Sequence, residues 1–230
     1  MNRIGIIGAM DVETDMLKSE VQNSKTEVFA QTEFVSGTIG KTKVVVCKCG
    51  VGKVNAAVAT QILIDKYNVS EILNVGVACS LSEEVQIGNA VVATDFCEWD
   101  IDITALGEPR GYIENIDKIK IPTSKNLSEK VYKACKNCGM NVFQGTVASA
   151  DTFIASDDTK AMLKKEFGAI AGEMEGASIA HTAYLNNIEF SALRCISDGG
   201  DKDAQMDYPK FKKIAAQKET AIVLNLLQNY

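Results

Sequence analysis

Apolar residues occur along the chain in short continuous runs that alternate with stretches of helical period. Such runs are typical of strands buried on both faces of a sheet, and they cover residues 3–10, 71–76, 90–94, 141–148, 169–175 and 190–198. Amphipathic stretches that predict helices lie between or after them, at 54–67, 124–139, 156–167, 176–186 and 208–228. The alternation predicts the α/β class, with a central mixed β-sheet flanked by helices.

Three segments add detail to this alternation. Residues 34–37 and 43–47, separated by a Gly40-Lys41 turn, predict a β-hairpin. Residues 98–123 have little periodicity, which predicts a long loop of the kind that is functional or mobile in compact domains. In the last helix, the spacing places one group of residues on a single buried face: Phe211, Ile214, Ala215, Ile222 and Leu226.

Length and charge narrow the classes of protein. The chain has 230 residues and shows no internal repeat or linker, so we expect one domain over 1–230. A net charge of −6 without a basic stripe argues against a nucleic-acid partner. The sequence contains no run of eighteen apolar residues, so we expect no membrane span. The first residues do not resemble a signal peptide, and we therefore expect a cytoplasmic protein.

The seven cysteines fit a reducing compartment better than a disulfide framework, because their number is odd. Two closely spaced pairs, Cys47/Cys49 and Cys135/Cys138, would form a four-cysteine zinc site if they met in space. We prefer a structural role, with the first pair on one strand face and the second one helical turn apart. The single histidine, His181, lies in a helical pattern. We therefore expect neither a metal nor a cofactor.

The glycine-rich turn at 50–53 follows a predicted strand and precedes a helix. A dinucleotide fingerprint would require a third glycine where Asn55 stands, and a P-loop would require Ser or Thr where Val54 stands. Both assignments fail. The segment is either a plain tight turn or a turn whose backbone approaches a small ligand.

Carboxylates stand at or just beyond the ends of three separate predicted strands: Glu13, Glu175 and Asp198. Ligands of α/β sheets bind beyond the carboxyl ends of strands, and a charge beside a buried strand is costly unless it has a partner. The pattern predicts a ligand site that uses paired carboxylates for general acid and base chemistry, as in glycoside cleavage. For Asp11 and Asp15, a solvated helix N-terminus is the better interpretation.

Five segments, in the right order, together resemble the 5′-methylthioadenosine/S-adenosylhomocysteine nucleosidases. They are IGIIGAMDVE (4–13), GVGKVNAA (50–57), DTFI (151–154), EMEG (173–176) and RCISD (194–198). The resemblance covers essentially the whole chain. It implies a nucleoside phosphorylase-like, single-domain three-layer sandwich, a homodimer, and a small-molecule nucleoside as substrate.

The resemblance also implies roles for individual residues. Asp198 would be the general acid toward N7 of adenine, with a pKa raised by burial. Glu13 would be the general base for the attacking water, and Glu175 would bind the ribose hydroxyls and stabilise an oxocarbenium-like transition state. The remaining expected site residues are Met174 on the ribose, Phe153 stacking on the purine, Ile154 at the adenine edge, Ser197 placing Asp198, Arg194 near the water, and Glu173, Val51, Val77, Ile103 and Tyr208 around them.

Some of these residues have simpler interpretations. Met174 and Phe153 would more often be core residues, and Arg194 would serve only as an ion partner of Glu173 or Glu175. Members of the family usually carry a hydroxyl residue and a glycine where this chain has Val77 and Cys79. In the loop, many family members carry aromatic residues over the 5′ group, whereas this chain has Leu106 and Glu108, with Arg110 close by. This difference leads to the hypothesis of a larger or more polar 5′ substituent than methylthio.

Two other functions remain open at this point. A purine nucleoside phosphorylase shares the fold, but it needs a cationic phosphate site, and Glu13 in that position would repel the anion. A non-catalytic nucleoside-binding homologue is the second alternative, since a fold does not fix a function and Val77 and Cys79 depart from the family pattern.

Overall fold

We obtained the fold as a computed structural model, which describes residues 3–230. The strands form one ten-stranded mixed sheet: β1 Arg3–Gly8, β2 Gln22–Phe29, β3 Thr32–Ile39, β4 Thr42–Lys48, β5 Glu71–Ser80, β6 Ala90–Glu98, β7 Ile121–Pro122, β8 Val142–Ser149, β9 Ala169–Glu173 and β10 Glu189–Asp198. The helices are α1 Asp11–Ser19, α2 Lys53–Tyr67, α3 Lys125–Asn137, α4 Asp157–Phe167, α5 Gly176–Leu185 and α6 Ala204–Gln228.

The sheet has two parts that share β5. Strands β1, β4, β3 and β2 extend in order from one edge of β5, with β1 parallel to both β4 and β5. On the other side, β5 pairs with β10, β10 with β6, β6 with β8 and β8 with β9. Strand β9 returns to the end of β5 through the Cys79–Gly172 and Ser80–Ala171 pairs. These five strands therefore close into a ring.

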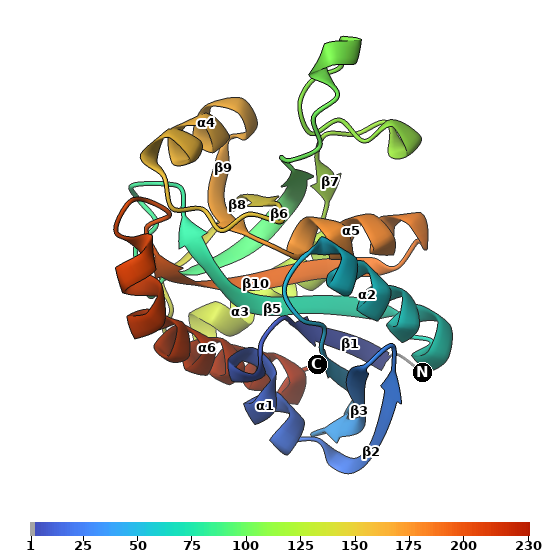
Figure 1. Cartoon of the computed structure of the whole chain (residues 1–230). Coiled ribbons are helices and arrows are strands. Elements are labelled where there is room, and N and C mark those ends of the chain that lie inside the picture. The colour runs from blue at the N-terminus through green and yellow to red at the C-terminus, as the bar shows by residue number, and fades with distance from the viewer. Residues whose placement is uncertain (1–2) are drawn as a thin grey trace.

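Helices cover the sheet on both sides, as the alternating pattern predicts (Figure 1). Helices α2 and α5 pack against each other over one apolar core, which includes Leu63 and Ile179. Helices α1, α3 and α6 pack over a second core, which includes Leu17, Val131 and Val223. The three-layer α/β arrangement is thus confirmed.

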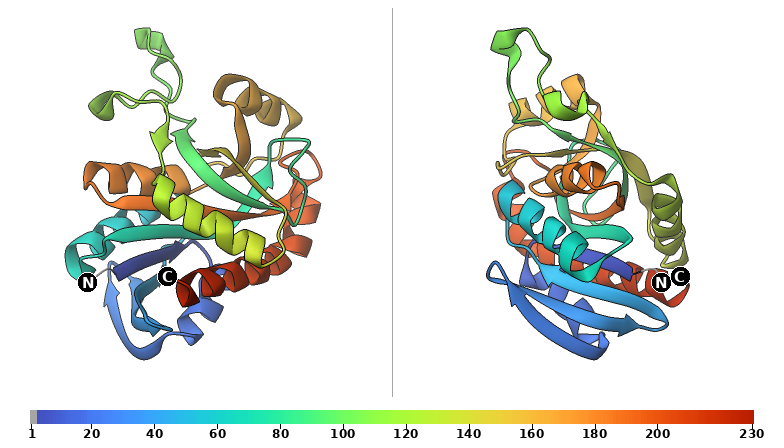
Figure 2. Two further views of the ribbon diagram at one scale, coloured as in Figure 1. Left: turned by 180° about the vertical axis from the view of Figure 1, so that it is seen from behind. Right: turned by 90° about the vertical axis from the view of Figure 1, so that its right-hand side faces the viewer.

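The predicted loop after β6 projects from the body of the molecule (Figures 1 and 2). It contains two short 3-10 helices, Thr104–Leu106 and Glu114–Ile116, before β7. Across residues 3–230, no helix is long and apolar enough to cross a membrane.

The sequence pattern does not indicate strand β2, because it is an edge strand that pairs with β3 and its residues are mainly polar and exposed. Two expectations about the last helix are wrong. Helix α6 begins at Ala204 rather than 208, with Pro209 inside it. Ile214, expected on its buried face, is 50% exposed because Ala215, Glu219 and Ile222 mark the face toward the sheet.

Strand β5 is longer than its neighbour β1, and this difference positions the site. Pairing with β1 ends at Ile7 and Asn74, whereas β5 continues to Ser80. The backbone N–H groups of Gly76 and Val77 consequently donate to carboxylates, Glu219 and Glu13 respectively. The end of β5 thus offers donors to the region where the neighbouring strand ends also meet.

Gly176, the first residue of α5, packs against the ring of Phe96. A Cβ built at this position would lie 2.8 Å from Cζ of Phe96, closer than real Cβ contacts. Alanine gains at most about 1 kcal/mol of helix propensity over glycine, whereas overpacking a core typically costs about 1–3 kcal/mol. We expect Gly176→Ala to lower the free energy of unfolding, as measured in urea.

A matched substitution in the same helix separates this steric effect from a general effect on α5. Thr182→Ala removes a hydroxyl that bonds only the Ser178 carbonyl, and it should change stability by less than about 0.5 kcal/mol. A Gly176→Ala protein as stable as the wild type would contradict the packing argument.

Candidate active site

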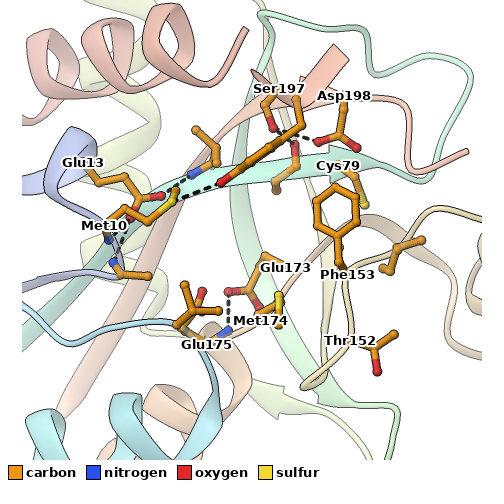
Figure 3. A pocket seen from close by; sticks show the side chains of 17 residues that line it. Met10, Glu13, Cys79, Thr152, Phe153, Glu173, Met174, Glu175, Ser197 and Asp198 are labelled. Carbon is orange, nitrogen blue, oxygen red and sulfur yellow. Dashed lines mark hydrogen bonds between the residues drawn. The ribbon is translucent and has the colours of Figure 1, made fainter. Parts of the chain in front are cut away.

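A cavity of about 220 Å³ lies where the ends of β1, β5, β9 and β10 meet (Figure 3). The segment 152–154 after β8, the glycine-rich turn after β4 and Tyr208 of α6 complete its wall. Eleven of the residues expected at the site line this one cavity: Glu13, Val51, Val77, Phe153, Ile154, Glu173, Met174, Glu175, Ser197, Asp198 and Tyr208. The three strand-end carboxylates singled out by the pattern are therefore brought together.

Glu13 is held on one side of the cavity by backbone donors. It is the third residue of α1, and its Oε2 accepts the N–H groups of Ala9 and Met10, each at 2.8 Å. Its Oε1 accepts the Val77 N–H at 3.0 Å. Burial raises the pKa of Glu13, and the Arg194 charge and these three N–H groups oppose the rise. The carboxyl is thus fixed in orientation, and these donors offset part of the cost of ionising it in a buried position.

Asp198 lies across the cavity from Glu13, at the end of β10 (Figure 3). Its Oδ2 accepts the Ser197 hydroxyl at 2.9 Å and its Oδ1 accepts the Gly200 N–H at 3.0 Å. Burial raises the pKa of Asp198, against the effect of these two donors. A carboxyl with a raised pKa beside an apolar wall is suited to donate a proton.

Glu175 and Glu173 flank Met174 on a third side of the cavity (Figure 3). Glu175 accepts the Gly52 N–H at 2.9 Å, so the glycine-rich turn holds a carboxylate of the site. Burial, followed by the charge of Glu173, raises the pKa of Glu175 to about 8. Glu173 accepts the N–H groups of Glu175 and Gly176 at 2.9 and 2.7 Å, which aligns the start of α5.

Aromatic and thioether groups form the remaining wall. Phe153 is 43% exposed, and its ring meets that of Tyr208 edge to face with centroids 5.5 Å apart. The Tyr208 hydroxyl donates to Sδ of Met10 at 3.1 Å. An exposed aromatic at the mouth of a cavity is available to a planar ligand, since ring stacking is favourable and costs no core contact.

Val77 and Cys79 both line the cavity. Val77 still supplies a backbone N–H to Glu13, although its side chain offers no hydroxyl. The Cys79 thiol lies near Asp198, and burial together with that carboxylate raises the pKa of the thiol. Cys79 is therefore a neutral, apolar-like part of the wall.

Two expected residues lie outside the lining. Arg194 is only 1% exposed and sits beneath the cavity, where it forms an ion pair with Glu173 and donates to Asn74. This placement matches its simpler interpretation as an ion partner. Ile103 precedes the short helix Thr104–Leu106 in the projecting loop. Arg110 of that loop pairs with Asp102 and Glu166, so the hypothesis of a polar 5′ group gains no support from it.

A layer of buried polar residues behind the cavity was missed in the sequence. Asn74 accepts a hydrogen bond from Arg194, and the Ser149 hydroxyl donates one to Glu173. Glu219 of α6 accepts the N–H of Gly76. The sequence signal for Glu219 is a carboxylate that shares a helix face with Ala215 and Ile222. No comparable pattern marks Asn74, whose importance depends on contacts across the sheet.

The described lining of the cavity contains no Lys, Arg or His side chain. Within residues 3–230, no group of three or more His, Cys, Asp or Glu residues is placed to hold a metal ion. The two cysteine pairs considered for zinc lie in different surroundings: Cys47 is buried, whereas Cys138 is exposed at the end of α3. The cavity therefore offers carboxylates and apolar surface as its chemistry.

Comparison with known proteins agrees with this geometry. The chain matches the phosphorylase superfamily over residues 3–228. A relative from Bacillus licheniformis, named 5′-methylthioadenosine/S-adenosylhomocysteine nucleosidase, is 31% identical over 227 residues, with 98% of each chain covered.

Solved structures are similar over the whole fold. The Neisseria meningitidis nucleosidase of the same name, in complex with methylthio-immucillin-A, has a TM-score of 0.96 at 29% identity and covers 100% of both chains. A Helicobacter pylori protein named futalosine hydrolase has a TM-score of 0.95 at 30% identity, covering 100% of this chain and 98% of that chain. The chain belongs to the 5′-methylthioadenosine/S-adenosylhomocysteine nucleosidase family of the phosphorylase superfamily.

Proposed function

We propose that this protein hydrolyses the N-glycosidic bond of 5′-thio-substituted adenosines, methylthioadenosine and S-adenosylhomocysteine, and releases adenine. The observation that carries the proposal is the set of three carboxyl groups, Glu13, Glu175 and Asp198, around one apolar-walled cavity. The names of the relatives, and the inhibitor bound by the Neisseria protein, support the same substrate class.

Asp198 acts as the general acid in this proposal. Cleavage leaves the electron pair of the glycosidic bond on the purine, and a proton delivered to N7 makes adenine a neutral leaving group. The raised pKa of Asp198 keeps the proton available, while Ser197 and the Gly200 N–H fix its direction. Positioned general acids of this kind contribute about 10²- to 10⁴-fold to a rate.

Glu13 acts as the general base from the opposite side. Water attacking the sugar carbon must lose a proton, and a carboxylate held by three N–H groups is a fixed acceptor for it. A base and an acid on opposite sides of a scissile bond are the arrangement that inverting glycoside cleavage requires.

Glu175 accepts hydrogen bonds from the ribose hydroxyls and responds to the charge that develops on the sugar. Its pKa of about 8 means that the free carboxyl holds a proton near neutral pH. Positive charge on an oxocarbenium-like ribose favours the ionised form, so the electrostatic stabilisation grows as the transition state is approached.

The apolar wall binds the rest of the nucleoside. Phe153, with Tyr208 at its edge, offers a ring face to the purine, and the backbone of Ile154 lies beside them to read the adenine edge. Met174 packs on the ribose, between the two glutamates of its segment, and Val51 of the glycine-rich turn closes the wall.

Asp198→Asn tests the assignment of the acid. The amide keeps the size of the side chain but has no acidic proton, so kcat for adenine release should fall by about 10²- to 10⁴-fold, with a smaller change in KM. Asp203→Asn, an exposed neighbour at the start of α6, is the matched control and should retain activity. An Asp198→Asn protein with wild-type kcat would exclude this residue as the acid.

Phosphate dependence separates hydrolysis from phosphorolysis. A phosphorylase needs a cationic site for its anion, whereas the described cavity is lined by carboxyls such as Glu13 and by no cationic side chain, so phosphate should not bind there. Adenine release should proceed at an unchanged rate when phosphate is omitted, with free 5′-substituted ribose as the second product. A requirement for phosphate and the formation of a sugar 1-phosphate would establish the phosphorylase alternative.

The same assay, read out as release of any free purine base, defines the substrate. Because a protein named futalosine hydrolase is as similar in structure as the nucleosidases, the substrates compared are methylthioadenosine, S-adenosylhomocysteine and futalosine. Tight binding of these nucleosides without release of base would instead indicate a non-catalytic nucleoside-binding protein.

We also propose that residues 1–230 form one nucleosidase-like domain, which works as a homodimer in the cytoplasm. The seven cysteines are all free, which fits a reducing compartment. Helices α2 and α5 lie side by side (Figure 2) and expose apolar residues, with Val54 at 74% and Leu185 at 53% exposure. Apolar side chains gathered on neighbouring helices are typical of an interface.

Val54→Glu tests this surface. A charge buried against an apolar partner surface should weaken association by about tenfold or more, which light scattering after size exclusion would detect as a shift toward the monomer. Val28→Glu, at an exposed apolar residue of β2, is the control and should leave the mass unchanged. A monomeric wild type would refute the homodimer.

A further inference from the structure

Glu219 is a buried carboxyl that the proposed mechanism does not use. It lies in the middle of α6, is 1% exposed, and faces the sheet between Ala215 and Ile222. Its Oε1 accepts the N–H of Gly76 in β5, whereas its Oε2 is buried without a hydrogen-bond partner among the described residues.

Gly76 connects this carboxyl to the proposed base. A Cβ at Gly76 would lie 2.8 Å from Oε1 of Glu13 and would also collide with the Arg194 guanidinium. The backbone of Gly76 therefore packs directly against both side chains. The next N–H along the strand, that of Val77, donates to Glu13 at 3.0 Å. Glu219 and Glu13 thus accept hydrogen bonds from two successive peptide N–H groups of β5.

The two carboxyls differ in how well their charged forms are stabilised. Glu13 accepts three backbone N–H groups, whereas Glu219 accepts one. Hydrogen bonds to a carboxylate favour its charged form, and two like charges in a dry site disfavour each other. A single proton shared between the two groups should therefore reside on Glu219.

The surroundings of Glu219 contain one positive charge. The groups that act on it are Glu13 of α1 and Arg194 of β10, and Cys195 of β10 and Cys135 of α3 respond to it. From β5 its contact is the backbone of Gly76. Arg194 already pairs with Glu173, and burial and the Glu13 charge raise the pKa of Glu219 well above its usual value.

We propose that Glu219, in its protonated form, is a positioning residue for the attacking water: it anchors the Gly76–Val77 backbone from α6 so that Glu13 remains aligned and is the ionised member of the pair. The inference rests on the proposed hydrolysis of 5′-thio-substituted adenosines. Glu219 does not line the cavity, so it acts through Glu13 and not on the nucleoside.

The test compares Glu219→Ala and Glu219→Gln with the wild type. Alanine removes the anchor, and a small displacement of a reacting group costs up to about 10²-fold in rate, so kcat should fall roughly 10- to 100-fold with little change in KM. Glutamine accepts the Gly76 N–H without a charge and should recover most of the loss. Thr220→Val is the matched control, because the Thr220 hydroxyl bonds only the Ala216 carbonyl within α6.

The pH dependence of activity, compared between the wild type and Glu219→Gln, distinguishes a neutral from an ionised Glu219. Activity falls at low pH as Glu13 takes up a proton. If Glu219 is neutral in the wild type, Glu219→Gln leaves this acid limb in place. If Glu219 were ionised, removing its negative charge would lower the pKa of Glu13 and move the limb to lower pH, which would overturn the proposal.

Infrared difference spectra provide a readout independent of turnover. In the wild-type minus Glu219→Gln difference spectrum at neutral pH, the bands of Glu175 and Asp198 cancel and a protonated-carboxyl band of Glu219 should remain. A difference spectrum without that band would overturn the inference even if Glu219→Ala fails to fold. Wild-type kcat in Glu219→Ala, or a Glu219→Gln protein as impaired as Glu219→Ala, would also overturn it. A wild type that releases no adenine would refute the proposed function itself, and the inference with it.

Discussion

One buried guanidinium placed among several buried carboxyls is the constraint on which the site depends. Arg194 is the only basic residue among the buried residues of the described chain, and Glu13, Glu173, Glu175 and Glu219 surround it or act on it. A buried ion pair stabilises little by itself, but removing one partner leaves an uncompensated charge that is strongly unfavourable. One cation cannot balance four carboxylates, so some of these groups must hold protons or accept other donors.

Backbone N–H groups supply most of those other donors, which explains the shape of the fold around the cavity. N–H groups at the start of α1 donate to Glu13, and those at the start of α5 donate to Glu173. The N–H of Gly52 in the turn after β4 donates to Glu175. Each donor is free because a strand has just ended or a helix has just begun, and such positions leave N–H groups without a partner. A site rich in carboxylates and poor in lysine and arginine therefore has to lie where strand ends and helix starts converge.

This arrangement also distinguishes the proposed acid, Asp198, from the proposed base, Glu13. Asp198 accepts two hydrogen bonds, whereas Glu13 accepts three and is near Arg194. Burial raises the pKa of both, but the opposing effects differ, and this difference suits one carboxyl to hold a proton and the other to accept one. The same chemical group is thus suited to two different roles by its surroundings.

Local sequence pattern is sufficient to locate the elements with strong periodicity and the carboxylates at their ends. Continuous apolar runs revealed the buried strands, and Glu13, Glu175 and Asp198 were identified because a charge at the end of such a run is conspicuous. The edge strand β2 was not visible, since its residues are polar and face solvent on most sides. Three placements depend on long-range packing: Arg194 lies beneath the cavity, Ile103 lies outside it, and Glu219 contacts Gly76 from 143 residues away. Periodicity states which face of an element is buried, but the partner that this face meets depends on how distant segments pack, and the local pattern carries no record of that.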